Sequence, residues 1–81
     1  MFIEKDNALV AEFLFPDFRR AFAFMTEVAA VAEQLHHHPE WSNVWNKVAV
    51  KLTTHDSGNT VTALDRKLAA ACEEIYLRHS S

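Results

Sequence analysis

Residues 16–41, PDFRRAFAFMTEVAAVAEQLHHHPEW, contain the pattern that decides the fold. Their apolar side chains recur at the three- and four-residue spacing of an amphipathic helix. These are Phe18, Ala21, Phe22, Met25, Val28, Ala29, Ala32 and Leu35. Asp17 can cap or favourably charge the helix start, whereas Pro39 cannot continue a helix and disfavours the helical conformation at His38. We therefore predict a helix over residues 17–35, followed by a loop that carries the histidines.

Two strands are expected before this helix. Phe2-Ile3-Glu4 forms a short first segment, and Lys5-Asp6-Asn7 is a polar break. Leu9 to Phe15 follows, with an apolar residue at every second position, as in a strand with one buried face. This region is predicted to be a short strand that turns into a longer one.

A hairpin is expected after the helix. Between Trp41 and Thr54 the content of β-branched and aromatic residues rises, which favours strands. Asn46-Lys47 is a plausible tight turn, because Asn tolerates a positive φ. The favoured interpretation is strands over 41–45 and 48–54, and one long strand is the alternative.

A second helix is predicted over residues 63–78. Thr62 and Asp65 have the spacing of a capping box, and an apolar stripe follows them. The elements then run β-β-α-β-β-α, which predicts a single α+β domain over residues 1–81, with a four-stranded antiparallel sheet and helices packed on one face.

Composition excludes several classes of function. The formal net charge of the 81 residues is −3, and the longest basic run is Arg19-Arg20, so nothing indicates binding to nucleic acid or to an anionic membrane. Cys72 is the one cysteine, so no internal disulfide can form, and its apolar surroundings predict a buried thiol. No leader-like segment or membrane-spanning run is found, and we expect a soluble cytoplasmic protein.

Histidines are the candidate chemical groups. Glu33 and His37 are four residues apart and share a face if the helix extends that far, so the carboxylate could orient the imidazole. His38 lies in the loop fixed by Pro39, and His55 ends a strand beside a glycine-containing turn. Two imidazoles on opposite sides of a substrate can donate one proton and remove another without a cofactor.

Other interpretations of these residues remain open. The histidine run could be a solvated loop without a task, and His and Glu are also good zinc ligands, although adjacent histidines in an extended loop diverge. Trp41 and Trp45 could stack on a planar substrate or belong to the core or an interface. Asp65 is equally compatible with a helix cap and with a site role, and Glu33 with a solvated position.

Taken together, these residues resemble the pterin-4a-carbinolamine dehydratase family. The resemblance rests on Glu33-x3-His37-His38-Pro39-Glu40-Trp41, Asn43-Val44-Trp45-Asn46, Thr54-His55-Asp56 and Asp65, and it covers about residues 8–78. It implies removal of water from a 4a-hydroxytetrahydropterin to give a quinonoid dihydropterin, in tetrahydropterin recycling. It also implies that neither a metal nor a cofactor is needed, and a possible link to an aromatic amino-acid hydroxylase.

The resemblance also implies roles for single residues. His37 and His55 would share the general acid and base work, and His38 would bind and position the pterin within the same catalytic set. On the substrate-binding side, Glu33 would orient the site, Trp41 would help to wall it, and Asp65 matches the family's closing aspartate.

This sequence departs from the family pattern in places. We expect the family's N-terminal helix to be absent, and His36, Asn59 and Leu64 stand where other residue types are common. These departures motivate a second hypothesis, in which a non-catalytic dehydratase-like domain acts as a dimeric adaptor for binding or assembly. On either hypothesis we expect a homodimer formed through the sheet, because pairing protects strand edges.

Overall fold

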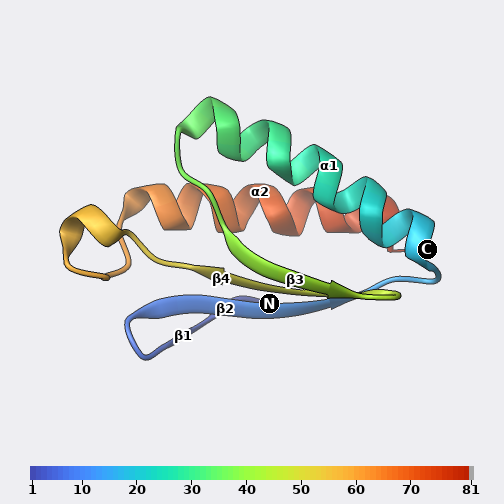
Figure 1. Cartoon of the computed structure of the whole chain (residues 1–81), viewed down its shortest axis with the longest axis horizontal. Coiled ribbons are helices and arrows are strands. Elements are labelled where there is room, and N and C mark those ends of the chain that lie inside the picture. The colour runs from blue at the N-terminus through green and yellow to red at the C-terminus, as the bar shows by residue number, and fades with distance from the viewer. Residues whose placement is uncertain (81) are drawn as a thin grey trace.

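The structure is a computed structural model that describes residues 1–80. Its elements are β1 (Ile3–Lys5), β2 (Ala8–Leu14), α1 (Phe18–Leu35), β3 (Glu40–Val44), β4 (Lys47–Leu52), the short 3-10 helix η1 (His55–Ser57) and α2 (Ala63–His79). The four strands form one antiparallel sheet in the order β1-β2-β4-β3. Both helices cover the same face of this sheet (Figure 1). The predicted α+β class, element order and one-sided helix packing are confirmed.

The ends of α1 follow from local side-chain and backbone chemistry. Asp17 caps its start, where the carboxylate accepts a hydrogen bond of 2.8 Å from the backbone N–H of Arg20. At the other end His36 adopts the left-handed conformation, with φ 51°, and its N–H bonds back to the last turn. The helix therefore stops at Leu35, and the chain changes direction before His37.

Tight turns set the register of both hairpins. Asp6 and Asn7 both have positive φ, as the preferred two-residue hairpin turn requires, and they join Lys5 to its partner Ala8. The hairpin between β3 and β4 is confirmed over one long strand, but the predicted turn is wrong by one residue. Val44 pairs with Lys47, so the turn is Trp45-Asn46, and Trp45 takes the positive φ.

Asn46 was predicted to take the positive φ of the turn, but in the structure it links the turn to Phe15. Its side-chain amide donates a 2.9 Å hydrogen bond to the carbonyl of Phe15, and its own carbonyl accepts one of 2.9 Å from the Phe15 N–H. The hairpin turn is thereby tied to the segment that leads into α1.

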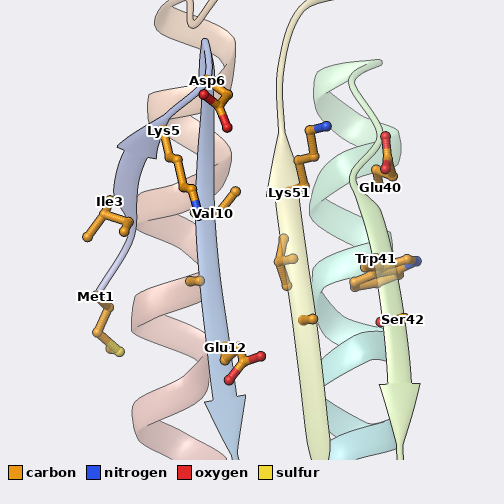
Figure 2. A pocket seen from close by; sticks show the side chains of 13 residues that line it. Met1, Ile3, Lys5, Asp6, Val10, Glu12, Glu40, Trp41, Ser42 and Lys51 are labelled. Atoms are coloured by element: carbon orange, nitrogen blue, oxygen red, sulfur yellow. The ribbon is translucent and has the colours of Figure 1, made fainter.

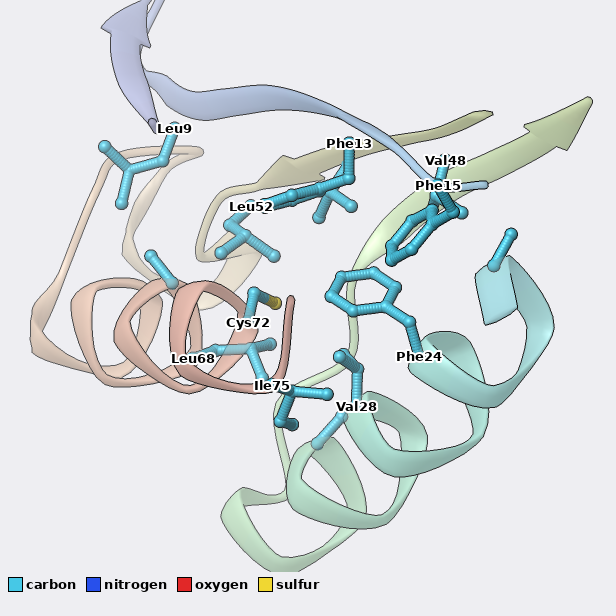
Figure 3. Packing of buried hydrophobic residues seen from close by; sticks show 14 residues of the cluster. Leu9, Phe13, Phe15, Phe24, Val28, Val48, Leu52, Leu68, Cys72 and Ile75 are labelled. Atoms are coloured by element: carbon cyan, nitrogen blue, oxygen red, sulfur yellow. The ribbon is translucent and has the colours of Figure 1, made fainter. Parts of the chain in front are cut away.

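The core lies between the sheet and the two helices (Figure 3). Phe13 of β2 and Phe24 of α1 are fully buried, with ring centroids 5.0 Å apart. Leu52 of β4 and Leu68 of α2 are fully buried in the same cluster. Cys72 is buried in the same cluster, and this burial raises the pKa of its thiol to about 12. The prediction of a buried cysteine is confirmed. Of the helices described, none is long and apolar enough to cross a membrane.

Candidate functional site

The candidate histidines and Asp65 lie at one end of the molecule. The C-terminal end of α1, the short helix η1 and the start of α2 lie together there, while the turn between β3 and β4 lies at the opposite end (Figure 1). His37 and His38 occupy the connection from α1 to β3, His55 begins η1, and Asp65 lies in the first turn of α2. Three segments that are distant in sequence thus supply the site.

The side chain of Asp65 organises this end. It is fully buried, and its carboxylate accepts hydrogen bonds from the ring of His37 at 2.6 Å, from the hydroxyl of Thr54 at 2.7 Å and from the backbone N–H of Thr62 at 2.8 Å. The Thr62 contact completes the predicted capping box of α2. Asp65 is therefore a helix cap, and it also holds the candidate residue His37; its site role stays a prediction.

The environment of Asp65 keeps the carboxylate ionised. Burial, the largest influence, raises the pKa of this group, but the hydrogen bonds from His37, Thr62 and Thr54 outweigh it, and the pKa lies below its usual value of 3.8. An ionised carboxylate can only accept hydrogen bonds. Nε2 of His37 must therefore carry the proton that it shares with Asp65.

His37 is held differently from the way the sequence suggested. The predicted partner Glu33 does not bind it; that prediction is wrong, because the left-handed residue His36 ends the helix one residue too early for a shared face. Its side chain is only 11% exposed and turns toward α2 instead. Within residues 1–80, Nδ1 of this ring has no hydrogen-bond partner in the protein. His37 is thus an oriented imidazole with one nitrogen left for chemistry.

Glu33 pairs with His38 instead, at 2.9 Å. Both side chains are well exposed, at 77% and 66%, so the ion pair adds little stability. The hydrogen bond from His38 lowers the pKa of Glu33. Glu33 therefore steadies a surface histidine rather than the buried one.

His55 lies on the surface, directly after Thr54. Its Nδ1 is 2.7 Å from the side-chain oxygen of Asn59. Because Thr54 also binds Asp65, the segment that carries His55 is attached to the carboxylate that holds His37. The arrangement joins the loops of two histidines through one buried group.

Thr54 and Asn59 make contacts at this site that were not predicted from the sequence. Thr54 is buried two residues after the end of β4, and its hydroxyl is also 2.7 Å from that of Thr62. A threonine directly before a candidate histidine was the one available signal, since nothing local indicates that it meets a helix cap. Across residues 1–80, no group of three or more His, Cys, Asp or Glu side chains is arranged to hold a metal ion.

The two tryptophans lie apart from each other. Trp41, in β3, is half-buried against the core and also lines a groove of about 680 Å³ on the open face of the sheet (Figure 2). The lining of this groove includes none of the histidines described. Trp45 is 65% exposed at the distant hairpin turn. Trp45 is thus remote from the histidines, and the role of Trp41 as a wall of their site stays a prediction.

Comparison with known proteins places this arrangement in a family. The family model described as "Pterin 4 alpha carbinolamine dehydratase" matches residues 2–75. The chain belongs to the pterin-4a-carbinolamine dehydratase family. A relative from Prochlorococcus marinus (strain MIT 9515) is 50% identical over 70 residues, which cover 86% of this chain and 72% of the relative. One from Rhizorhabdus wittichii is 54% identical over 69 residues, covering 85% and 70%. Each is named "Putative pterin-4-alpha-carbinolamine dehydratase".

Solved structures agree with the dehydratase fold. A transcriptional coactivator/pterin dehydratase from Brucella melitensis superposes with a TM-score of 0.88 at 45% identity, covering 93% of this chain and 81% of that one. A pterin dehydratase-like protein, identified as a RuBisCO assembly factor in the alpha-carboxysome, gives a TM-score of 0.75 at 21% identity, covering 94% and 87%. The second similarity shows the fold alone.

Proposed function

We propose that this protein dehydrates a 4a-hydroxytetrahydropterin to a quinonoid dihydropterin by histidine acid/base catalysis. Membership of the dehydratase family supports the substrate class. The single observation that carries the proposal is the 2.6 Å hydrogen bond between the ring of His37 and the buried, ionised Asp65. A carboxylate that fixes one ring nitrogen leaves the other in a defined state for proton transfer.

The reaction needs two proton transfers and no change of oxidation state. An acid protonates the 4a-hydroxyl group, the C4a–O bond breaks, and water leaves. A base removes the proton from N5, and the C4a–N5 double bond forms. Because no electrons are gained or lost overall, the proposed chemistry requires no redox cofactor, and two imidazoles can supply both proton transfers.

The residues divide this work as follows in the proposal. His37 and His55 share the acid and base roles, and the exposed His38, which follows His37 in sequence, binds and positions the pterin. Asp65 holds His37 in one tautomer and in one orientation. Glu33 acts through its hydrogen bond to His38, and Trp41 contributes an aromatic surface.

Turnover of a chemically generated 4a-hydroxytetrahydropterin, followed by stopped-flow absorbance, tests the proposal. The protein should accelerate loss of the substrate, and His37→Ala and His55→Ala should each reduce kcat/KM by roughly 10²- to 10⁴-fold. His36→Asn is the matched control, because His36 is exposed and Asn tolerates its left-handed conformation. No acceleration by the unmodified protein would exclude the dehydratase function.

A second candidate function is that of a non-catalytic assembly module. The groove on the open face of the sheet favours it, because that face carries both apolar and charged side chains and has no cover from the chain described (Figure 2). The RuBisCO assembly factor shows that this fold is compatible with such a role. Capture of a stable protein partner by both the unmodified protein and His37→Ala, without any turnover, would favour this candidate.

We further propose a homodimer formed through the sheet. β1 and β3 are the outer strands, and an outer strand presents unpaired backbone groups. Light scattering at micromolar concentration should give twice the mass of 9.2 kDa, and a monomer would contradict the proposal. We place the reaction in tetrahydropterin recycling in the cytoplasm, where a lone thiol such as Cys72 stays reduced, with an aromatic amino-acid hydroxylase as the source of substrate.

A further inference from the structure

The loop around His55 is closed by its own hydrogen bonds. The backbone N–H of Thr54 donates to the carbonyl of Thr60 at 3.0 Å, and that of Asn59 donates to the carbonyl of Thr54 at 3.1 Å. The hydroxyl of Thr60 adds a bond of 2.9 Å to the carbonyl of Ser57. These contacts fix the backbone on both sides of His55 and of Asn59.

We propose that Asn59 is a positioning residue that sets the tautomer of His55. The side-chain oxygen of Asn59 faces Nδ1 of the imidazole at 2.7 Å. A carboxamide oxygen accepts but cannot donate a hydrogen bond, so the neutral ring must carry its proton on Nδ1. The lone pair is thereby directed to Nε2, the nitrogen farther from the backbone.

Asn59 meets two requirements at one position. Its φ is 60°, and among residues that have a side chain, Asn and Asp adopt this left-handed region most readily. Glycine would satisfy the backbone but offer no acceptor, and most other residues would strain the turn. Asp would satisfy both requirements, because its carboxylate is also an acceptor. The chain therefore offers a matched pair of variants that separate turn geometry from the hydrogen bond.

The neighbouring carboxylates do not supply the hydrogen bond to Nδ1 of His55. Asp56 lies in the same turn but makes no hydrogen bond to the ring among residues 1–80. Asp65 is occupied by His37, Thr54 and Thr62. The tautomer of His55 thus depends on one exposed side chain, which can be changed without disturbing the core.

Long-range ¹H–¹⁵N correlation spectra of the ¹⁵N-labelled full chain test the proposal, at about pH 8.5 where imidazoles are neutral. His55→Gln assigns the resonances. The unmodified protein and Asn59→Asp should show a protonated Nδ1, and Asn59→Gly should shift the population toward a protonated Nε2. A protonated Nε2 in the unmodified protein, or no change in Asn59→Gly, would overturn the proposal.

The consequence for turnover rests on the proposed function. Asn59→Gly should lower kcat by roughly two- to tenfold, the range expected for loss of one hydrogen bond, with a smaller change in KM, and Asn59→Asp should restore it. Equal kcat in all three proteins, with the spectra as expected, would show that the tautomer does not matter for catalysis and would overturn this part. Absence of any turnover would remove the proposed function, while the spectra would still decide the role of Asn59.

Discussion

Replacing Asp65 by Asn should separate the two tasks of this residue. The amide oxygen can take the place of the carboxylate oxygen that accepts from Thr54 and from the N–H of Thr62, at 2.7 and 2.8 Å. The amide nitrogen then faces Nε2 of His37, where the carboxylate now accepts at 2.6 Å. Since that nitrogen can only donate, the proton of the ring must move to Nδ1. The variant keeps the cap but reverses the tautomer of His37.

The two effects should differ greatly in size. Hydrogen bonds to a charged group contribute about 1.5–3 kcal/mol and neutral ones about 0.5–1.5 kcal/mol, so Asp65→Asn should cost roughly 1–2 kcal/mol of stability. Asp65→Ala loses the cap and leaves buried donors without an acceptor, at a cost of roughly 3–5 kcal/mol. Turnover should fall by roughly 10²- to 10⁴-fold in Asp65→Asn, because proton transfer at His37 is lost.

Urea unfolding measures the stability of these variants, stopped-flow absorbance measures kcat/KM, and ¹⁵N spectra report the tautomer of His37. Asp65→Asn should remain folded at 25 °C, whereas Asp65→Ala should lose much of the free energy of unfolding expected of so small a domain. A folded Asp65→Asn with kcat/KM within threefold of the unmodified protein would refute the reasoning. So would a spectrum in which Nδ1 of His37 stays unprotonated.

Three further results are expected. Phe24→Ala should lower the free energy of unfolding by roughly 3–5 kcal/mol in urea titrations, because the ring is fully buried, whereas Phe22→Ala, at a ring 53% exposed, should cost less than about 1 kcal/mol. Because the pKa of Asp65 is lowered from 3.8, its stabilisation is complete above about pH 5 and is lost as the pH falls below that value; the difference in unfolding free energy between pH 7 and pH 3 should therefore shrink in Asp65→Asn. Cys72, with its pKa raised to about 12, should resist iodoacetamide in the folded protein at pH 8 and react in urea, as mass spectrometry would show.

The elements of the fold could be predicted from the sequence because their causes are local. Helix periodicity, the cap at Asp17 and the Thr62–Asp65 box each depend on residues within one turn of one another. The turn at Trp45-Asn46 was not predicted, and the side chain of Asn46 bonds to Phe15, 31 residues away, a contact that no local pattern reveals. Local propensity favoured a positive φ at Asn46, whereas the structure has it at Trp45.

The site was predicted less completely for the same reason. The histidines and Asp65 were found, but the partner of His37 was not, since spacing on a helix assumes that the helix continues. One left-handed residue, His36, ended it, so that Glu33 bonds to His38 and His37 bonds to Asp65. The contact between His37 and Asp65 joins residues 28 apart, which no local pattern reveals.

The double role of Asp65 affects how function can be recognised among proteins of this fold. A chain without catalytic activity would still need a hydrogen-bond acceptor at this position to cap the start of its second helix. Retention of the aspartate would then indicate the architecture rather than the chemistry. Among residues 1–80, the side chains of His38 and His55 bond only to exposed neighbours and support neither the core nor a helix end. In a chain that no longer catalyses the reaction, we therefore expect substitutions at those two positions first.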